Sequence, residues 1–363
     1  MTETITADVH GQDVYVGIDT HKRNWSVCVL GEGWEERPFS QDPRPGQLVD
    51  HLRRKFPGGR YHLAYEAGFA GHWIAREFAL HGVDCIVVNA ADIPTNDKDR
   101  RRKTDARDCR KIARAHRAHT LEPIYLPTQQ SEEDRKFMRT RLEMVRKQTR
   151  TKNQIKSLIA ISGTELPPAA ELPTWSRSFI VWLEGLFADR PSLKMSLDVY
   201  LEELRSQRTW LVKQLQQIRE LSRTDRFAPN VKLLMSVPGI GLIGAMTLLC
   251  ELIDIGRFRD LDHLASYIGL VPDTRSSGDS EHTVGMTSRA NKHLLVIIIE
   301  ASWVAIRKDP SLTEKFEKDA QRMKRSQAIV RTARRLLSRI HHVLREKEPY
   351  RIAVSTTSLI DQS

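Results

Sequence analysis

The N-terminal third of the chain alternates short apolar runs with amphipathic stretches. Residues 14–30 (VYVGIDTHKRNWSVCVL) form two β-rich runs around a polar turn, which predicts a strand hairpin. The same patterns predict strands at 61–67 and 84–90, and helices at 46–56, at 71–81 and from about Thr104. A hairpin followed by alternating helices and strands predicts a mixed α/β sheet domain over residues 1–125.

The middle segment, residues 126–225, is charged and carries two predicted long helices with regular apolar stripes. The first, 128–162, places apolar positions at Met138, Leu142, Val145 and Thr149. The second runs from Pro191 to Ser222, with a stripe at Leu197, Leu201, Leu204, Arg208, Leu211, Leu215 and Ile218. This spacing of four and three predicts a coiled coil or a long helical hairpin. We favour an oligomerisation arm, and the alternative is packing inside one subunit.

Residues 226–363 are predicted to be mostly helical, so that the fold class is α/β plus all-α. Gly239 and Gly241 flank one apolar residue in LLMSVPGIGLIGAMTLL (233–249). The segment resembles a helix-hairpin-helix element, whose turn amides can face a phosphate. A tight helix–helix turn would need the same glycines. The tail at 322–345 mixes basic and apolar positions, which fits either a nucleic-acid-binding helix or an ordinary surface helix.

The net charge of the chain indicates what kind of partner it binds. The chain has 57 Lys and Arg against 46 Asp and Glu, which gives a formal net charge of +11 and a pI of about 9.6. Such an excess favours a polyanionic partner. The sequence contains no run of about 18 apolar residues, so no membrane span is expected. Residues 1–12 lack the apolar core of a signal peptide. The four cysteines are scattered, without a CxxC pair. We therefore expect a cytoplasmic protein with reduced cysteines.

Four carboxylates stand where predicted elements begin or end. Asp19 ends an apolar strand, Glu66 ends a second strand, and Asp105 and Asp108 are three apart, so they share a helix face. Such a cluster repels itself unless it holds hard cations such as Mg²⁺ or Mn²⁺. Two ions about 3.5–4 Å apart would suit phosphodiester chemistry. Taken singly, each acid is also explained as a turn residue, a surface carboxylate or a helix N-terminal charge.

A basic stretch adjoins the acidic pair. Ten of the twenty residues from Lys98 to Arg117 are Lys or Arg. The residues predicted to contact nucleic acid here are Arg100, Arg101, Arg102, Lys103 and Arg107. A stretch of this kind is usually a solvated surface, but its position would place phosphates beside the metals.

The motifs GIDTHK, YEAG, KTDARD, VPGIG and GLVPDTRSSG occur in this order along the chain. Together they resemble the insertion-sequence "one-ten" family of DEDD transposases, to which the Piv-type DNA invertases are related. The resemblance implies a RuvC-like, RNase H-fold N-terminal domain whose acidic tetrad falls on Asp19, Glu66, Asp105 and Asp108. It also implies a C-terminal transposase domain at 226–363.

The same resemblance implies a serine nucleophile in the polar loop between Pro272 and Thr287. Ser277 matches the family's serine before glycine, and Ser276 is its neighbouring rival. Arg275, Arg289 and Lys292 are the expected phosphate contacts, although Asp279 and Glu281 make the loop less positive than in the family. A serine hydroxyl needs a base or a metal to activate it, and the family brings it beside the acidic site across subunits.

What the resemblance implies beyond the residues is a nucleoid-associated bacterial transposase that works as a dimer or tetramer. It would join DNA through a phosphoserine intermediate, guided by a noncoding bridge RNA. Three alternatives stay open. A junction-resolving nuclease would need the acids but not the serine, a site-specific invertase would need no RNA, and a non-catalytic binding protein would need neither site.

Overall fold

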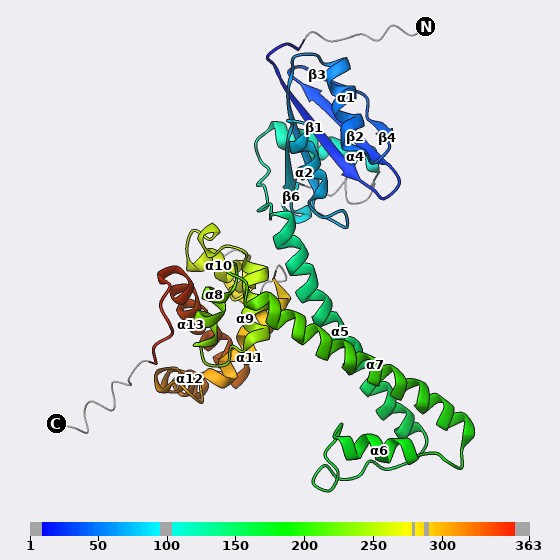
Figure 1. The fold of residues 1–363 in the computed structure, drawn as a ribbon. Coiled ribbons are helices and arrows are strands. Elements are labelled where there is room, and N and C mark those ends of the chain that lie inside the picture. The colour runs from blue at the N-terminus through cyan, green and yellow to red at the C-terminus, as the bar shows by residue number, and fades with distance from the viewer. Residues whose placement is uncertain (1–8, 95–103, 278–279, 287–289, 353–363) are drawn as a thin grey trace, which may run out of the picture. The chain divides into compact units, whose positions relative to one another are not determined.

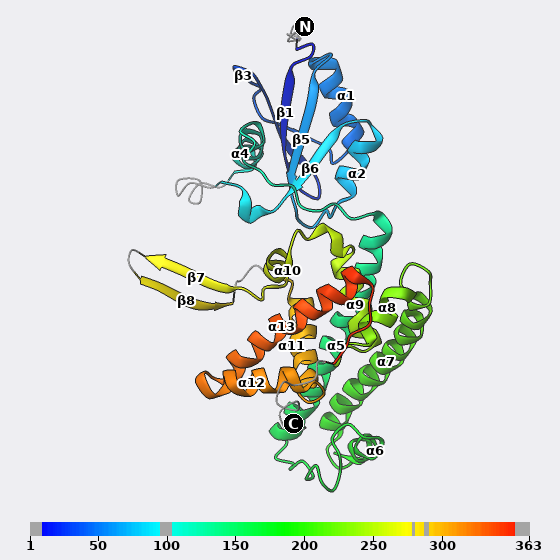
Figure 2. The same cartoon turned by 90° about the vertical axis from the view of Figure 1, so that its left-hand side faces the viewer.

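A computed structural model of the protein describes residues 9–94, 104–277, 280–286 and 290–352. The chain forms two compact units, Met1–Gln129 and Gln130–Ser363. The division falls close to the end predicted for the sheet domain. Figures 1 and 2 show the elements of each unit. Within the described ranges, no helix is both long and apolar enough to cross a membrane.

The first unit is built on a six-stranded mixed sheet. Its strands are β1 (Asp13–Thr20), β2 (Trp25–Gly31), β3 (Trp34–Glu35), β4 (Phe39–Gln41), β5 (Arg60–Glu66) and β6 (Asp84–Val88). The order is β3-β2-β1-β5-β6, with β4 also paired to β2. β2 runs antiparallel to β1, whereas β5 runs parallel to β1 and to β6. This arrangement, with a helical region after it, confirms the predicted mixed-sheet, RNase H-like domain.

Helices cover both faces of the sheet (Figure 2). They are α1 (Pro45–Lys55), α2 (Trp73–Leu80) and α4 (Asp105–Arg117). Val14, Val16 and Ile18 of β1 are buried with the apolar residues of α1 and α2. Tyr15, on the alternate face, packs near Cys109 of α4. Because side chains alternate along a strand, the odd-numbered positions of β1 face α4.

The second unit begins with three helices, α5 (Gln129–Ile161), α6 (Arg177–Gly185) and α7 (Pro191–Ser222), which we call the arm. The apolar stripe predicted on α7 is used inside the chain. Leu197, Leu201 and Leu204 are buried in one cluster with Ile155 of α5 and Phe179 of α6. The stripe therefore packs within one subunit, which is the alternative to the favoured oligomerisation seam. Whether the arm joins subunits through other residues stays a prediction.

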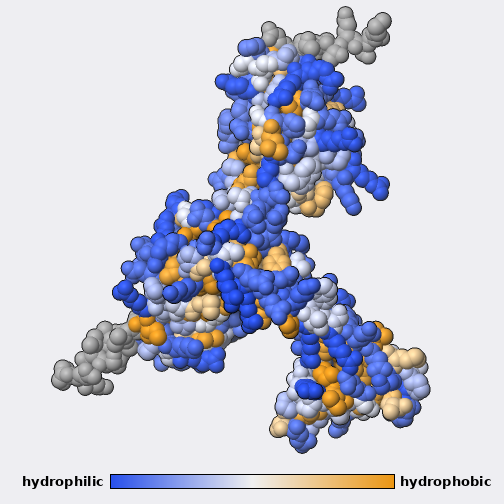
Figure 3. Space-filling view, viewed as in Figure 1, coloured by the Kyte–Doolittle hydropathy of each residue, from blue (hydrophilic) through white to orange (hydrophobic). Residues whose placement is uncertain are grey.

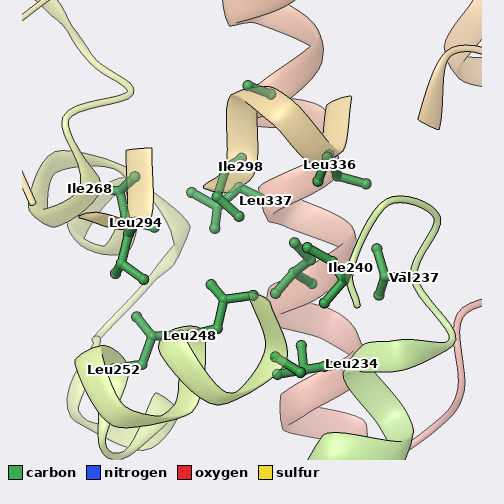
Figure 4. Packing of buried hydrophobic residues seen from close by; sticks show 14 of the residues in the cluster. Leu234, Val237, Ile240, Leu248, Leu252, Ile268, Leu294, Ile298, Leu336 and Leu337 are labelled. Atoms are coloured by element: carbon green, nitrogen blue, oxygen red, sulfur yellow. The ribbon is translucent and has the colours of Figure 1, made fainter. Parts of the chain in front are cut away.

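The remaining elements are α8 (Ala228–Met235), α9 (Leu242–Leu252), α10 (Leu261–Ile268), β7 (Pro272–Ser277), β8 (Ser280–Met286), α11 (Lys292–Ala305), α12 (Pro310–Arg322) and α13 (Arg325–Glu346). Their helices share one apolar core, part of which Figure 4 shows around Leu248, Ile298 and Leu337. Met138 and Ile218 of the arm belong to the same core. The arm is thus continuous with these helices rather than a separately packed domain.

The tail helix α13 is amphipathic, as its sequence predicts. Its apolar side, which includes Leu336 and Ile340, is fully buried. Four arginines on its other sides each contact a carboxylate within the chain. The pairs are Arg331 and Arg335 with Asp319, Arg334 with Asp262, and Arg339 with Asp309. This internal pairing favours an ordinary surface helix over a nucleic-acid contact at these arginines.

Candidate active site

The sheet brings two of the predicted acids to one edge. Asp19 lies two residues beyond Gly17 on β1, so its side chain is on the α4 face of the sheet. Ile18 pairs with Tyr65 in the parallel register between β1 and β5. Asp19 and Glu66 follow directly on their strands and therefore lie at the same edge. The Asp19 side chain is 20% exposed, and Glu66 is at the surface.

Gly17 allows α4 to approach this edge closely. A Cβ on Gly17 would lie 2.1 Å from the carbonyl oxygen of Cys109 and 2.4 Å from the amide nitrogen of Ala113. No side chain fits at such distances, so the helix backbone lies directly on the strand. Asp105 and Asp108 occupy the first turn of α4, where the helix dipole favours negative charge. The close contact places this turn beside the end of β1.

A histidine joins two of the acids. His21 Nε2 lies 3.3 Å from Asp19 Oδ2 and 3.5 Å from Asp105 Oδ1. One ligand atom from each of the three residues lies within 4.8 Å of the others. Ligands in octahedral positions around one ion at 2.0–2.1 Å are themselves about 3 Å apart. Asp19, His21 and Asp105 are therefore spaced as a set of ligands for one cation.

Sequence reasoning missed His21, although the residue stands inside the GIDTHK motif. Its backbone explains the position. His21 N donates to Asn24 O at 3.1 Å, which closes the turn between β1 and β2. The turn carries the imidazole back over the strand end. A histidine two residues after a predicted metal-binding aspartate is a signal that the sequence did offer.

Asp108 adds an unused oxygen one turn along α4. Its Oδ1 lies 3.2 Å from Lys111 Nζ, and the side chain is 17% exposed. Among the described residues, no hydrogen-bond partner reaches its buried Oδ2. A buried carboxylate oxygen without a donor is costly, and a cation would satisfy it. The donor set of carboxylate oxygens and one imidazole nitrogen thus fits a divalent metal.

The neighbouring cysteines do not extend this set. Burial raises the pKa of Cys109 to about 12 and that of Cys28 to about 11. Both thiols therefore stay protonated at neutral pH, whereas a metal ligand must be a thiolate. Cys109 Sγ instead donates to the carbonyl oxygen of Ala106 at 3.4 Å.

The predicted basic contacts fall into two groups. Arg107 lies half-buried in the first turn of α4, whereas Arg100, Arg101, Arg102 and Lys103 lie outside the described residues. Further along α4, Arg110 and Arg114 both bind the carboxylate of Glu35 on β3. Part of the positive charge on this helix is therefore neutralised within the sheet unit.

The segment predicted as a polar serine loop is a two-stranded hairpin (Figure 2). β7 and β8 pair antiparallel, with Arg275 opposite His282 and Ser276 opposite Glu281. Ser277 pairs with Ser280 at the end of the ladder, separated from it by Gly278 and Asp279, which lie outside the described residues. A Gly-Asp pair between two strands is a hairpin signal, and the polar composition obscured it.

Helices α10 and α11 hold the two ends of this hairpin through a buried network. Arg139 of α5 binds both oxygens of Glu251 on α9, at 2.6 and 2.7 Å, and Glu251 is 0% exposed. Asn291, which caps α11, donates to Glu251 Oε2 at 2.9 Å. Tyr267 of α10 donates to the Glu251 carbonyl oxygen at 3.3 Å. Sequence reasoning missed this network because its members lie far apart along the chain.

The two glycines of the turn differ in their surroundings. Gly239 fits the interpretation as a tight helix–helix turn, and Gly241 is placed where its amide could face a phosphate. Gly239 has a φ of +88°, and a Cβ there would lie 2.5 Å from the carbonyl oxygen of Ala301. Its close packing on α11 supports the tight helix–helix turn. Gly241 is exposed at the start of α9, with open space at its Cβ position. Lys292, another predicted phosphate contact, is exposed at the start of α11, and Arg289 lies outside the described residues.

Known proteins match both units. The DEDD-type IS110 model, described as a transposase, matches residues 16–162. The model described as "Transposase IS116/IS110/IS902 family" matches residues 231–317. Together they cover well over half of the chain and include all four acids of the predicted tetrad, Ser277 and both glycines of the turn.

Individual relatives extend over most of the chain. The y4qE protein of Sinorhizobium fredii is 27% identical over 299 residues, which is 80% of this chain and 72% of the relative. The transposase for insertion sequence element IS1533 of Leptospira borgpetersenii is 27% identical over 68% of this chain and 72% of its own. The transposase for IS1111A of Coxiella burnetii is 24% identical over 83% of this chain and 80% of its own. The chain belongs to the IS116/IS110/IS902 family and is a DNA transposase of insertion sequences.

Proposed function

We propose that this transposase cuts and rejoins DNA strands by metal-assisted attack of Ser277, with a covalent phosphoserine–DNA intermediate. The observation that carries the proposal is the convergence of Asp19, His21 and Asp105 where β1 ends and α4 begins. A family of DEDD transposases needs divalent metal at such a site, and the ligand spacing and the unused Asp108 oxygen fit one.

We infer that Asp19, Glu66, Asp105 and Asp108 hold Mg²⁺ or Mn²⁺, with His21 as an additional ligand. The cation would stabilise negative charge on the phosphodiester and on the departing oxygen. The protein side chains set the position of that charge. Asp19 and Glu66 are fixed by paired strands, and the two α4 acids are fixed by the contact at Gly17. Rigid elements hold a site more accurately than loops do.

In the proposed reaction, the Ser277 hydroxyl oxygen forms a bond to the phosphorus of a DNA strand. The bond between that phosphorus and the departing 3′ oxygen breaks. The serine proton passes to a base, and the departing oxygen takes up a proton from solvent to leave as a 3′ hydroxyl. The reverse attack by another DNA 3′ hydroxyl releases the serine and rejoins the strand. The first stage exchanges one DNA phosphodiester for one phosphoserine linkage, and the second stage reverses this exchange, so no ATP is required.

The proposed partners are element-end and target DNA and a noncoding bridge RNA, acting with a dimer or tetramer of the protein. The basic segment around Arg107 and the exposed Lys292 support phosphate contacts, as does the net charge of +11. Arg100, Arg101, Arg102, Lys103, Arg275, Arg289 and Gly241 are proposed for the same role.

A trapping experiment tests the serine step. Incubation with Mn²⁺ and a labelled, nicked element-end DNA should give an adduct that resists denaturing detergent, and peptide mass spectrometry should place it on Ser277. Ser277→Ala and Asp19→Ala should each abolish the adduct and recombination but keep DNA binding within about twofold. Ser276→Ala is the matched control and should retain the adduct.

The alternatives predict different results. A junction-resolving nuclease would cleave with Ser277→Ala and form no adduct. A site-specific invertase would recombine in the absence of any RNA. Retained recombination by Ser277→Ala would reject the nucleophile, and retained recombination by Asp19→Ala would reject the metal site.

A further inference from the structure

In the outer half of the arm, several basic side chains form no ion pair with any described carboxylate. From Met144 to Ile161, α5 carries five basic residues and no acidic ones: Arg146, Lys147, Arg150, Lys152 and Lys156. Two other cations of the arm do pair with carboxylates, Arg205 with Glu184 and Lys194 with Asp198. Over the described ranges, no carboxylate forms an ion pair with Lys152, Lys156 or Arg208.

Two cations, Lys152 and Arg208, contact one tryptophan, and Lys156 lies next to Lys152. Lys152 Nζ lies 5.4 Å from the centre of the Trp175 ring, and Arg208 donates to the Trp175 carbonyl oxygen at 3.1 Å. Lys156 follows Lys152 by one helical turn on α5 and so lies on the same face. Gln207 of α7 donates to Thr151 of α5 at 3.0 Å. This hydrogen bond sets the register of the two helices, and the register in turn brings Arg208 and Lys152 to the same level of the arm.

Lys152, Lys156 and Arg208 repel one another when no anion lies between them. Burial lowers the pKa of Lys152, and the charges of Arg208 and Lys156 lower it further. The acid closest along α7, Glu203, accepts a hydrogen bond from Gln207 at 2.9 Å. Like charges held together in this way cost stability until a counterion neutralises them.

The backbone at the centre of the cluster is also unusual. Trp175 has a φ of +66°, a region that bulky residues rarely occupy. Such conformations persist where the surroundings enforce them, and they are frequent at ligand sites. Arg208 is the only polar member of the stripe on α7. Its position in the stripe is explained by its hydrogen bond to the Trp175 carbonyl oxygen.

We propose that Lys152 and Arg208, which contact Trp175, form a binding site for the phosphate backbone of a nucleic acid together with the neighbouring Lys156. Lysine and arginine neutralise phosphates and release counterions. Trp175, which packs against the apolar cluster of the arm, fixes the position of these cations. This phosphate site uses none of the acidic residues and none of the hairpin residues. It does not depend on strand transfer.

The test measures binding without chemistry, in EDTA, with the full-length protein. Fluorescence anisotropy follows labelled duplex DNA, single-stranded DNA and an RNA hairpin from 50 to 200 mM salt. The variant Lys152→Gln/Lys156→Gln keeps Arg208 and thus the contact that holds Trp175. Its matched control is Lys194→Gln/Arg205→Gln, which removes the same charge from paired cations of the arm.

For the nucleic acid that occupies the site, the variant should show a shallower slope of log Kd against log salt concentration than wild type. The difference in slope should be about 1.8 for a duplex or about 1.4 for a single strand. The ratio of wild-type to variant affinity should therefore be roughly tenfold larger at 50 mM than at 200 mM salt, and the control should stay within about twofold of wild type. The probe that shows the loss identifies the ligand as DNA or RNA.

Two results would overturn the site. One is an unchanged affinity and salt slope for all three probes. The other is an equal loss in the control, which would mean that only total charge matters. Thermal melting of both variants in the same buffer checks that the arm is intact, and a single Lys152→Arg variant, which retains the charge, should bind as wild type does.

Discussion

His21 is the side chain that most changes the chemistry expected of this site. Four carboxylates alone would favour hard cations such as Mg²⁺, whereas an imidazole nitrogen suits transition metals. The distances of 3.3 and 3.5 Å from His21 to Asp19 and Asp105 place that nitrogen among the acids. A nitrogen ligand should therefore shift metal preference toward Mn²⁺.

His21→Gln is expected to weaken Mn²⁺ binding by about tenfold or more, with a smaller effect on Mg²⁺. Isothermal titration measures both affinities. Pulsed electron paramagnetic resonance of the Mn²⁺-loaded protein should detect a histidine nitrogen in the wild type and in His81→Gln, but not in His21→Gln. Bound Mn²⁺ without any histidine coupling in the wild type would show that His21 is not a ligand.

Helices α5, α9, α10 and α11 meet at the Glu251 network, next to the two ends of the serine hairpin. The contact with Glu251 raises the pKa of Arg139 and thereby keeps both groups charged. Removing one partner of a buried ion pair leaves the other charge uncompensated. The network is thus a fixed base for β7 and β8, whose backbones pair mainly with each other.

Glu251→Ala should lower the free energy of unfolding by about 3 kcal/mol, because Arg139 then lacks its carboxylate. Urea denaturation at neutral pH measures this loss. Glu184→Ala, which breaks the exposed pair with Arg205, should cost less than about 1 kcal/mol. Equal effects of the two substitutions would mean that the buried network contributes no more than a surface ion pair.

Over the whole molecule, the residues proposed for catalysis belong to two compact units. The acids belong to Met1–Gln129 and the serine hairpin to Gln130–Ser363. The sheet unit has its own apolar cluster, which includes Val16, Leu48, Leu63 and Phe78. A unit with a separate core is able to fold alone. In the view of Figure 3, hydrophilic residues predominate on the surface, with smaller apolar patches among them.

A fragment of residues 1–129 is therefore expected to melt cooperatively and to bind Mn²⁺ within about threefold of the full chain. Calorimetry and titration measure the two properties. The same fragment with Asp19→Ala should melt similarly but lose the metal. A fragment that is unfolded, as judged by circular dichroism, would show that the sheet unit depends on the helices.

Much of the fold and part of the site follow from local patterns. Apolar alternation located β1, β5 and β6 within about two residues, and the stripe located α7, because such periodicities reflect a single buried face. The acids Asp19 and Asp105 were evident at element ends. The short strands β3 and β4 were not predicted, since two or three residues carry too little pattern.

Local sequence was insufficient wherever residues distant along the chain meet. The apolar stripe on α7 predicted a seam but could not say that Ile155 and Phe179 of the same chain would fill it. The serine segment gave a polar composition, and its pairing as β7 and β8 came only from the backbone. The sequence could not explain why Arg208 interrupts the apolar stripe of α7; its hydrogen bond to the Trp175 carbonyl oxygen does.

The order of motifs was enough to predict the family, which the family models confirm. Residue identity and short-range spacing were also enough to predict the four acids and most of the longer elements. Long-range packing added His21 to the acids and showed how Gly17 admits α4 to the strand. It also exposed the cation cluster of the arm. These features depend on which surfaces meet, and the free energy that selects those meetings comes from burial and charge summed over the whole fold.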